Sequence, residues 1–119
     1  MNTNLAGKRV LVVEDEPIIG MLIEDMLVEC GAVVVGPATH LDQALRFASD
    51  EPLDAAILDV NLDGQRSYAV ADVLKGRGIP YLFATGYGDG QLAREYGGAE
   101  VIEKPFRLET VAAAISRLV

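Results

Sequence analysis

The chain has 119 residues, half of them hydrophobic, which suits one domain over residues 1–119 and leaves no room for a separate output domain. A net charge of -8 argues against a nucleic-acid-binding protein, since such proteins show a basic stripe. With one cysteine, no signal peptide and no apolar segment of membrane length, the chain is expected in a reducing cytoplasm, and any output is expected through a partner surface.

Apolar runs alternate with helical periodicities along the chain. The first helix is expected from Pro17 to about Cys30, because Pro17 suits a first helical turn and Gly31 suits the stop. Its core face is predicted to hold Ile18, Ile19, Leu22, Met26 and Cys30. The expected strands cover residues 9–13, 32–36, 53–58, 79–85 and 99–102, and the later helices cover residues 41–49, 67–75, 91–96 and 107–118.

Strands that alternate with helices predict an α/β fold, in which helices cover both faces of a parallel sheet. For five strands the expected architecture is the flavodoxin-like (βα)5 three-layer sandwich, with strand order 2-1-3-4-5 taken from known sheets of this kind. That order makes strands 1 and 3 neighbours, so Asp15 and Asp59 are expected close together.

Polar residues follow the apolar runs at points where phosphate chemistry can use them. Glu14 and Asp15 follow the first strand, Asp59 ends the third, Thr85 ends the fourth, and Lys104 follows the fifth. The carboxyl ends of parallel strands meet at one edge of the sheet, so these side chains are expected together there. The three acids cannot all stay ionised at that edge without a cation.

Magnesium is the predicted cation, since Mg²⁺ prefers oxygen ligands and keeps several waters. Asp15 and Asp59 are the best candidates for direct ligands. The backbone carbonyl of Asn61 is a third candidate, and Glu14 is expected to act through water. For Glu16 we prefer the alternative that its charge favours the N-terminus of the following helix.

Asp59 is the predicted phosphoacceptor, because a carboxylate can attack phosphorus to give an aspartyl-phosphate. The alternative is a turn or helix-capping aspartate. Lys104 offers a charge and Thr85 a hydroxyl to the phosphoryl oxygens; the alternatives are a surface salt bridge and a helix cap. Pro105 is a candidate for a cis peptide that aims Lys104 inward.

Over essentially its full length the chain resembles the receiver domain of two-component response regulators. The resemblance rests on four segments in order: residues 10–16, Val-Leu-Val-Val-Glu-Asp-Glu; 57–59, Ile-Leu-Asp; 84–85, Ala-Thr; and 104–106, Lys-Pro-Phe. It implies that a histidine kinase or histidine phosphotransfer protein phosphorylates Asp59. It also implies that Glu14, Asp15, Asp59 and Asn61 hold Mg²⁺, and that Lys104 and Thr85 contact the phosphoryl group.

The same resemblance implies a regulator that assists only its own phosphorylation and dephosphorylation. A downstream protein is expected to bind the fourth helix, fifth strand and last helix. Residues 80–87, Pro-Tyr-Leu-Phe-Ala-Thr-Gly-Tyr, resemble the Phe-Ala-Thr-Gly-X-Tyr type of receiver, which is common in alphaproteobacteria. Members of this type are often stand-alone, and some are linked to general stress signalling.

The chain departs from the family pattern at two positions. Val101 stands where the family has a switch aromatic, so Tyr87 is a candidate replacement; the alternative is a packing tyrosine. Asp63 replaces a proline often found four residues after the phosphoacceptor, which predicts a looser or different loop.

Two rival functions stay open at this stage. Residues 59–64 faintly resemble the loop of aspartate-dependent phosphohydrolases, although Asn61 stands where those enzymes need a second aspartate. A flavin-binding flavodoxin-like carrier is disfavoured, because the acids after the first strand would repel a flavin phosphate. Partner binding and a phosphate-sink role are both open for a receiver.

Overall fold

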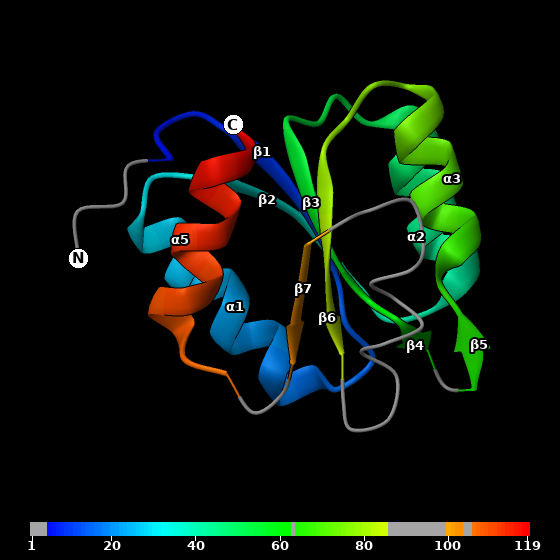
Figure 1. Ribbon diagram of the computed structural model, residues 1–119, viewed down its shortest axis with the longest axis horizontal. Coiled ribbons are helices and arrows are strands. Elements are labelled where there is room, and N and C mark those ends of the chain that lie inside the picture. Colours follow the sequence, from blue (N-terminus) through cyan, green and yellow to red (C-terminus); the bar gives the residue numbers. More distant parts are fainter. Residues whose placement is uncertain (1–4, 63, 86–99, 104–105) are drawn as a thin grey trace.

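The computed structural model describes residues 5–62, 64–85, 100–103 and 106–119, which form a parallel sheet between helical layers (Figure 1). The strands are β1 (Arg9–Val13), β2 (Val33–Ala38), β3 (Ala55–Asp59), β4 (Asn61–Leu62), β5 (Gln65–Arg66), β6 (Tyr81–Thr85) and β7 (Glu100–Glu103). The helices are α1 (Pro17–Glu29), α2 (Leu41–Asp50), α3 (Tyr68–Gly76) and α5 (Leu108–Leu118).

The main sheet has the order β2-β1-β3-β6-β7, and every neighbouring pair is parallel. These are the five predicted strands in the predicted order 2-1-3-4-5, so the fold prediction is confirmed. Each predicted boundary lies within two residues of the observed one; the helix expected over residues 91–96 lies outside the described residues. The carboxyl ends of the strands point toward the lower edge of Figure 1.

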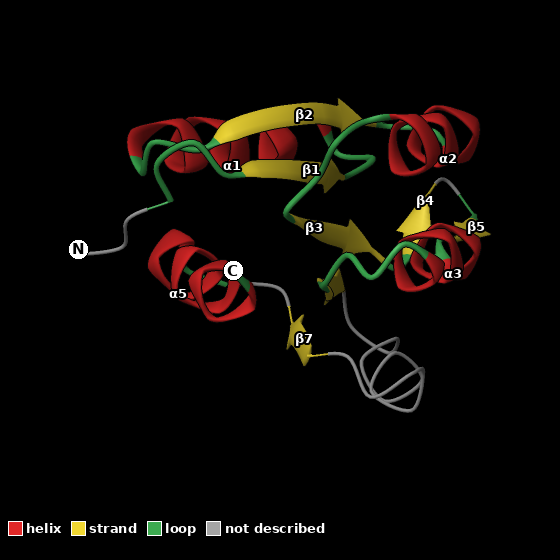
Figure 2. Ribbon diagram, turned by 90° about the horizontal axis from the view of Figure 1, so that it is seen from above, coloured by secondary structure: helices red, strands yellow, loops and turns green. Residues whose placement is uncertain are grey.

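Helices cover both faces of the sheet: α1 and α5 lie on one side, and α2 and α3 lie on the other (Figure 2). The central strand β3 is buried along its whole length. Its side chains alternate between the layers, with Ile57 packing in the core beside α1 and α5 and Leu58 in the core beside α2 and α3. Burial on both faces explains why β3 is a continuous apolar run.

The core-facing side of α1 differs from the prediction. Ile18 is 74% exposed and Leu22 is 48% exposed, although both were expected in the core. The buried positions of the helix are Gly20, Ile23, Met26 and Leu27, with Ile19 partly buried and Cys30 buried just beyond the end. Because α1 carries apolar residues around most of its circumference, periodicity alone did not determine which stripe meets the sheet.

A short hairpin follows the central strand and was missed by the sequence analysis. β4 and β5 pair antiparallel, with Leu62 opposite Gln65, and Gly64 lies in the turn between them. Gly64 has φ +87°, a value that suits glycine. Asp-Gly is a strong signal for a two-residue hairpin turn, and it was present in the sequence. The looser or different loop expected from Asp63 stays a prediction, because residue 63 lies outside the described residues.

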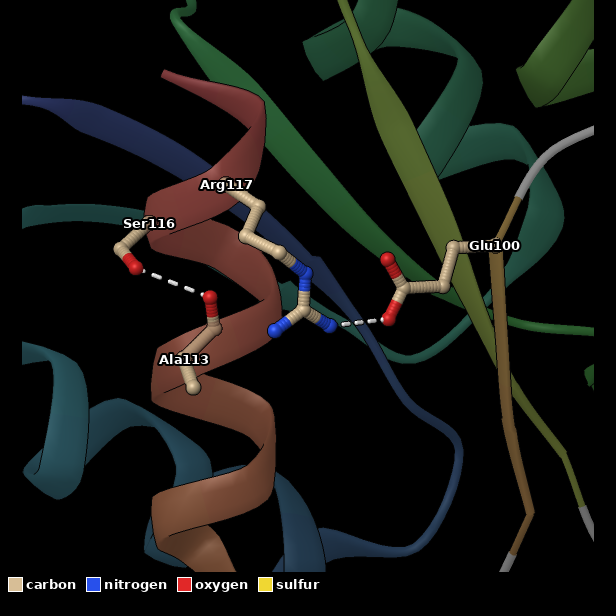
Figure 3. Close-up of polar contacts among 4 residues, drawn as sticks. All are labelled: Glu100, Ala113, Ser116 and Arg117. Carbon is tan, nitrogen blue, oxygen red and sulfur yellow. Dashed lines mark hydrogen bonds and ion pairs between the residues drawn. The ribbon is translucent and has the colours of Figure 1, made fainter.

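An ion pair links the edge strand β7 to the last helix. The Arg117 guanidinium donates to the Glu100 carboxylate, and the Ser116 hydroxyl donates to the carbonyl of Ala113 one turn earlier (Figure 3). Both charged side chains are exposed, so the pair contributes only about 0.2–1 kcal/mol to the free energy of unfolding.

Among the described helices, none has the length and apolar character needed to cross a bilayer.

Arg77, directly after α3, holds the end of α2. Its Nη1 donates to the carbonyl oxygens of Ala48 (2.5 Å) and Glu51 (2.9 Å). We expect Arg77→Ala to lower the free energy of unfolding by about 1–2 kcal/mol, because two charged hydrogen bonds to carbonyls at the end of α2 are lost. Urea denaturation measures this, with Lys75→Ala at an exposed position of α3 as the control. Equal destabilisation by both variants would contradict this role of Arg77.

Candidate metal and phosphoacceptor site

Three acids meet where two neighbouring strands end. Glu14 and Asp15 follow β1, and Asp59 is the last residue of β3. Val13 at the end of β1 pairs with Leu58, so the two strands end side by side. One carboxylate oxygen from each of the three lies within 4.8 Å of the others. The sheet therefore brings together the carboxylates that were predicted to converge.

The surroundings of these acids favour a cation. Glu14 is 1% exposed, Asp59 is 5% exposed and Asp15 is half-buried. Buried like charges repel one another strongly unless an opposite charge compensates them. Neighbouring oxygen ligands on an octahedral magnesium ion lie about 3 Å apart, so the three carboxylates, whose oxygens lie within 4.8 Å of one another, reach one ion by small side-chain movements. The donor set therefore fits Mg²⁺.

Glu14 is held through its backbone and its side chain. Its N–H donates to the carbonyl of Ala38 at the end of β2 (2.9 Å), and its Oε2 accepts from the N–H of Glu16 (3.1 Å). Glu16 itself is the exposed N-cap residue of α1, which agrees with its expected place at the helix start. The two neighbouring glutamates thus have different environments.

The hairpin after β3 orients the Asp59 carboxylate. The N–H of Asn61 donates to Asp59 Oδ1 (3.2 Å), and the Asn61 side-chain oxygen accepts from the N–H of Gly64 (2.9 Å). The Asn61 side chain therefore belongs to the hairpin turn. This arrangement is compatible with the predicted metal role of its backbone carbonyl, which does not need the side chain.

The remaining predicted site residues are described only in part. Thr85 is the last residue of β6, next to β3, where Ala84 pairs with Asp59; the Thr85 side chain is not among the described atoms. β7 ends opposite Thr85 at Glu103, the residue before Lys104. Lys104, Pro105 and Tyr87 lie outside the described residues, so their predicted roles stay predictions. Val101 is half-buried opposite Phe83.

One surface feature close to the acids was not expected from the sequence. The exposed apolar residues of α1 begin three positions after Asp15, so an apolar surface borders the acid cluster. The available signal was a helix with apolar residues on nearly all sides, which is more than one buried stripe requires.

The sequence matches known proteins along most of its length. Residues 10–116 match the family model of the response regulator receiver domain. The phyllosphere-induced regulator PhyR of Methylorubrum extorquens is 37% identical over 91% of this chain and 42% of PhyR. The transcriptional regulatory protein PdtaR of Mycobacterium tuberculosis is 30% identical over 91% of this chain and 55% of PdtaR. The chain therefore spans about half the length of these relatives.

Solved structures share the fold. SdrG from Sphingomonas melonis, whose solution structure is known, has 41% sequence identity to this chain. The two structures superpose with a TM-score of 0.82, and the match covers 94% of this chain and 96% of SdrG. The receiver domain of the sensor histidine kinase PA1611 from Pseudomonas aeruginosa is 28% identical, with TM-score 0.82 and coverage of 95% and 98%. That structure has a magnesium ion coordinated in its active-site cleft.

Proposed function

Because the chain belongs to the response regulator receiver domain family, we propose that it is a signalling switch activated by phosphorylation of Asp59. The observation that carries the proposal is the buried cluster of Glu14, Asp15 and Asp59, which lies at the end of the central strand. The test is to treat the purified chain with acetyl phosphate, with and without Mg²⁺. A mass gain of one phosphoryl group only with Mg²⁺ supports the proposal, and an unchanged mass in both conditions contradicts it.

The chemistry follows from the positions of the side chains. The Asp59 oxygen attacks the phosphorus of a phosphohistidine, an O–P bond forms, the N–P bond breaks, and the leaving imidazole retains its electron pair and takes up a proton. The N–H of Asn61 holds Asp59 Oδ1 and so orients the carboxylate for attack. Glu14, Asp15 and Asp59, together with the backbone carbonyl of Asn61, would hold Mg²⁺, and the ion would supply the positive charge that lets a phosphate approach the acids. Thr85 and Lys104 are proposed to contact the phosphoryl oxygens.

The rival functions receive no support from the comparisons. The matched family consists of regulatory receiver domains, and the curated relatives named above are called regulators. A receiver becomes phosphorylated itself and does not turn over a phosphate ester, so nothing favours the phosphohydrolase alternative. The flavin carrier is disfavoured for the electrostatic reason already given.

We further propose that the phosphodonor docks on the apolar face of α1, which comprises Ile18, Met21, Leu22 and Val28. This face begins next to the acid cluster, so a protein seated on it can present a phosphohistidine to Asp59. The exposed acids Asp25 and Glu29 lie on the same helix. The matching partner is a histidine kinase or histidine phosphotransfer protein with apolar residues flanked by Lys or Arg.

The double variant Ile18→Ser, Met21→Ser is expected to slow phosphoryl transfer from a phosphorylated histidine phosphotransfer protein by about 30-fold, because two apolar anchors are removed. Phosphorylation by acetyl phosphate is expected to be unchanged, since a small molecule needs no docking surface. Both rates are measured by electrophoresis of the phosphorylated chain. Val119→Ser, an apolar-to-polar change at an exposed position outside this face, is the control. An undiminished transfer rate in the double variant would remove this docking site.

For the output, we propose a surface formed by β7 and α5 together with the fourth helix expected over residues 91–96. The exposed ends of Glu100 and Arg117 lie on this surface (Figure 3). Tyr87 is the proposed replacement for the aromatic missing at Val101. A role in general stress signalling is part of the proposal; PhyR from Bartonella quintana, 29% identical, carries the name anti-anti-sigma factor. The phosphorylated chain then acts either by binding a downstream protein or as a phosphate sink for a shared kinase.

A further inference from the structure

We propose that a bulge in β2, formed by Gly36 and Pro37 and packed against Gly20 of α1, positions Glu14 for metal binding. We call these two β2 residues the Gly-Pro bulge. The inference rests on the proposed function, because that function assigns Glu14 to the magnesium site. It makes Gly20 and Gly36 positioning residues, although neither offers a side chain to the ion.

The bulge is visible in the pairing of β1 with β2. The strands pair regularly up to Leu11 opposite Val35, and the next pair is Val13 opposite Ala38. β1 therefore advances by two residues while β2 advances by three, so β2 contains one extra residue. Bulges of this kind bend a strand and re-aim the groups beyond them, often beside active sites.

Gly36 is required for this path of the chain. Its φ is +99°, a backbone angle that residues other than glycine rarely adopt. A Cβ added there would lie 2.7 Å from the nitrogen of Ala38 and 2.8 Å from the carbonyl oxygen of Val12. Both are backbone atoms of the paired strands, so the clash cannot be relieved by rotating a side chain.

The residue just beyond the bulge holds Glu14. The carbonyl of Ala38 accepts the N–H of Glu14 at 2.9 Å, directly after β1 ends. Peptide groups along a strand alternate in direction, so removing the extra residue would turn this carbonyl away from Glu14. The Gly-Pro bulge thus sets where the first acid of the site leaves the sheet.

Gly20 allows α1 to approach the same place. A Cβ at Gly20 would lie 3.3 Å from Pro37 Cβ, tighter than ordinary contact, and 3.8 Å from Glu14 Cβ. Glycine is unfavourable inside a helix, so its presence at a buried position of α1 has a packing reason here. The helix, the bulge and the acid meet at one point. A methyl group added there would press on Pro37, and through the bulge it would shift the Ala38 carbonyl that holds the N–H of Glu14.

Gly20→Ala is therefore expected to weaken Mg²⁺ binding by about tenfold, because outer-shell changes commonly reduce metal affinity by that amount. The thermal unfolding midpoint without metal is expected to stay level or rise, since alanine favours the helix. Isothermal titration calorimetry with Mg²⁺ and circular dichroism measure the two effects. Gly76→Ala is the matched control, because Gly76 ends α3 with an ordinary φ and open space around it. This control should leave Mg²⁺ affinity unchanged.

A second pair of variants tests Gly36. Gly36→Ala and Gly7→Ala both put alanine at a positive φ, but a Cβ at Gly7 meets nothing within 4 Å. Only Gly36→Ala is expected to reduce Mg²⁺ affinity. If Gly36→Ala does not fold, Gly20→Ala decides the matter alone.

A double variant shows whether the effect passes through Glu14. Gly20→Ala made in a Glu14→Gln background should cause no further loss of Mg²⁺ affinity, because the group being positioned is already changed. A full further tenfold loss would overturn the inference. The inference would also be overturned if the wild-type chain binds Mg²⁺ and the Gly20→Ala and Gly76→Ala variants bind it equally well. A wild-type chain that binds no Mg²⁺ would instead overturn the metal site in the proposed function.

Discussion

Asp59→Asn is expected to abolish phosphorylation of the chain by acetyl phosphate in the presence of Mg²⁺, with a rate loss of at least about a thousandfold. The amide has nearly the same shape as the carboxylate, so the hydrogen bond from the Asn61 N–H to Oδ1 can persist. The amide lacks the negatively charged oxygen that attacks phosphorus. Intact-protein mass spectrometry measures the loss directly.

Asp50→Asn is the matched control for this experiment. Asp50 is an exposed aspartate at the end of α2, outside the acid cluster, and its conversion removes the same charge from the chain. The control should be phosphorylated as fast as the wild type. Undiminished phosphorylation of Asp59→Asn would mean that a different residue accepts the phosphate, and the proposed function would then fail.

Asp15→Asn is expected to weaken Mg²⁺ binding by about 100-fold, because a direct carboxylate ligand loses its charge. Phosphorylation should then require far more Mg²⁺ than in the wild type. In the absence of metal the unfolding midpoint should rise, since one of three neighbouring negative charges is removed. The opposite signs of these two changes distinguish a metal ligand from a residue needed only for folding.

Glu16→Gln is the control for Asp15→Asn. Glu16 is the next residue, but it is exposed at the N-cap of α1 and lies outside the cluster of three acids. Its variant should change Mg²⁺ affinity by less than about threefold, through long-range charge alone. If both variants weaken binding equally, the assignment of Asp15 as a direct ligand is wrong.

The placement of Asp15 and Asp59 could be predicted from sequence because it depends on few choices. Two apolar runs end in acids, parallel strands share their carboxyl edge, and the strand order makes the two runs neighbours. Helix ends were also close to their predicted places, since residues such as Pro17 and Gly31 act locally. None of these inferences required knowledge of a side-chain contact.

The features that could not be predicted depend on contacts between distant segments. The Gly-Pro bulge is defined by the change of register between the pairs Leu11–Val35 and Val13–Ala38, and pairing registers cannot be read from a single strand. The exposed stripe of α1 follows from how that helix packs on the sheet, not from its composition. The hairpin after Asp59 is different, because its Asp-Gly signal was local and was overlooked.

The exposed apolar face of α1 has a consequence for how such proteins diversify. Ile18, Met21, Leu22 and Val28 contribute little to the core, so replacing them costs the fold little. With the proposed docking of the phosphodonor on this face, gene duplicates can change it and acquire a new kinase while the buried acids stay the same. Insulation between parallel signalling routes can thus evolve at the surface without a compensating change in the interior.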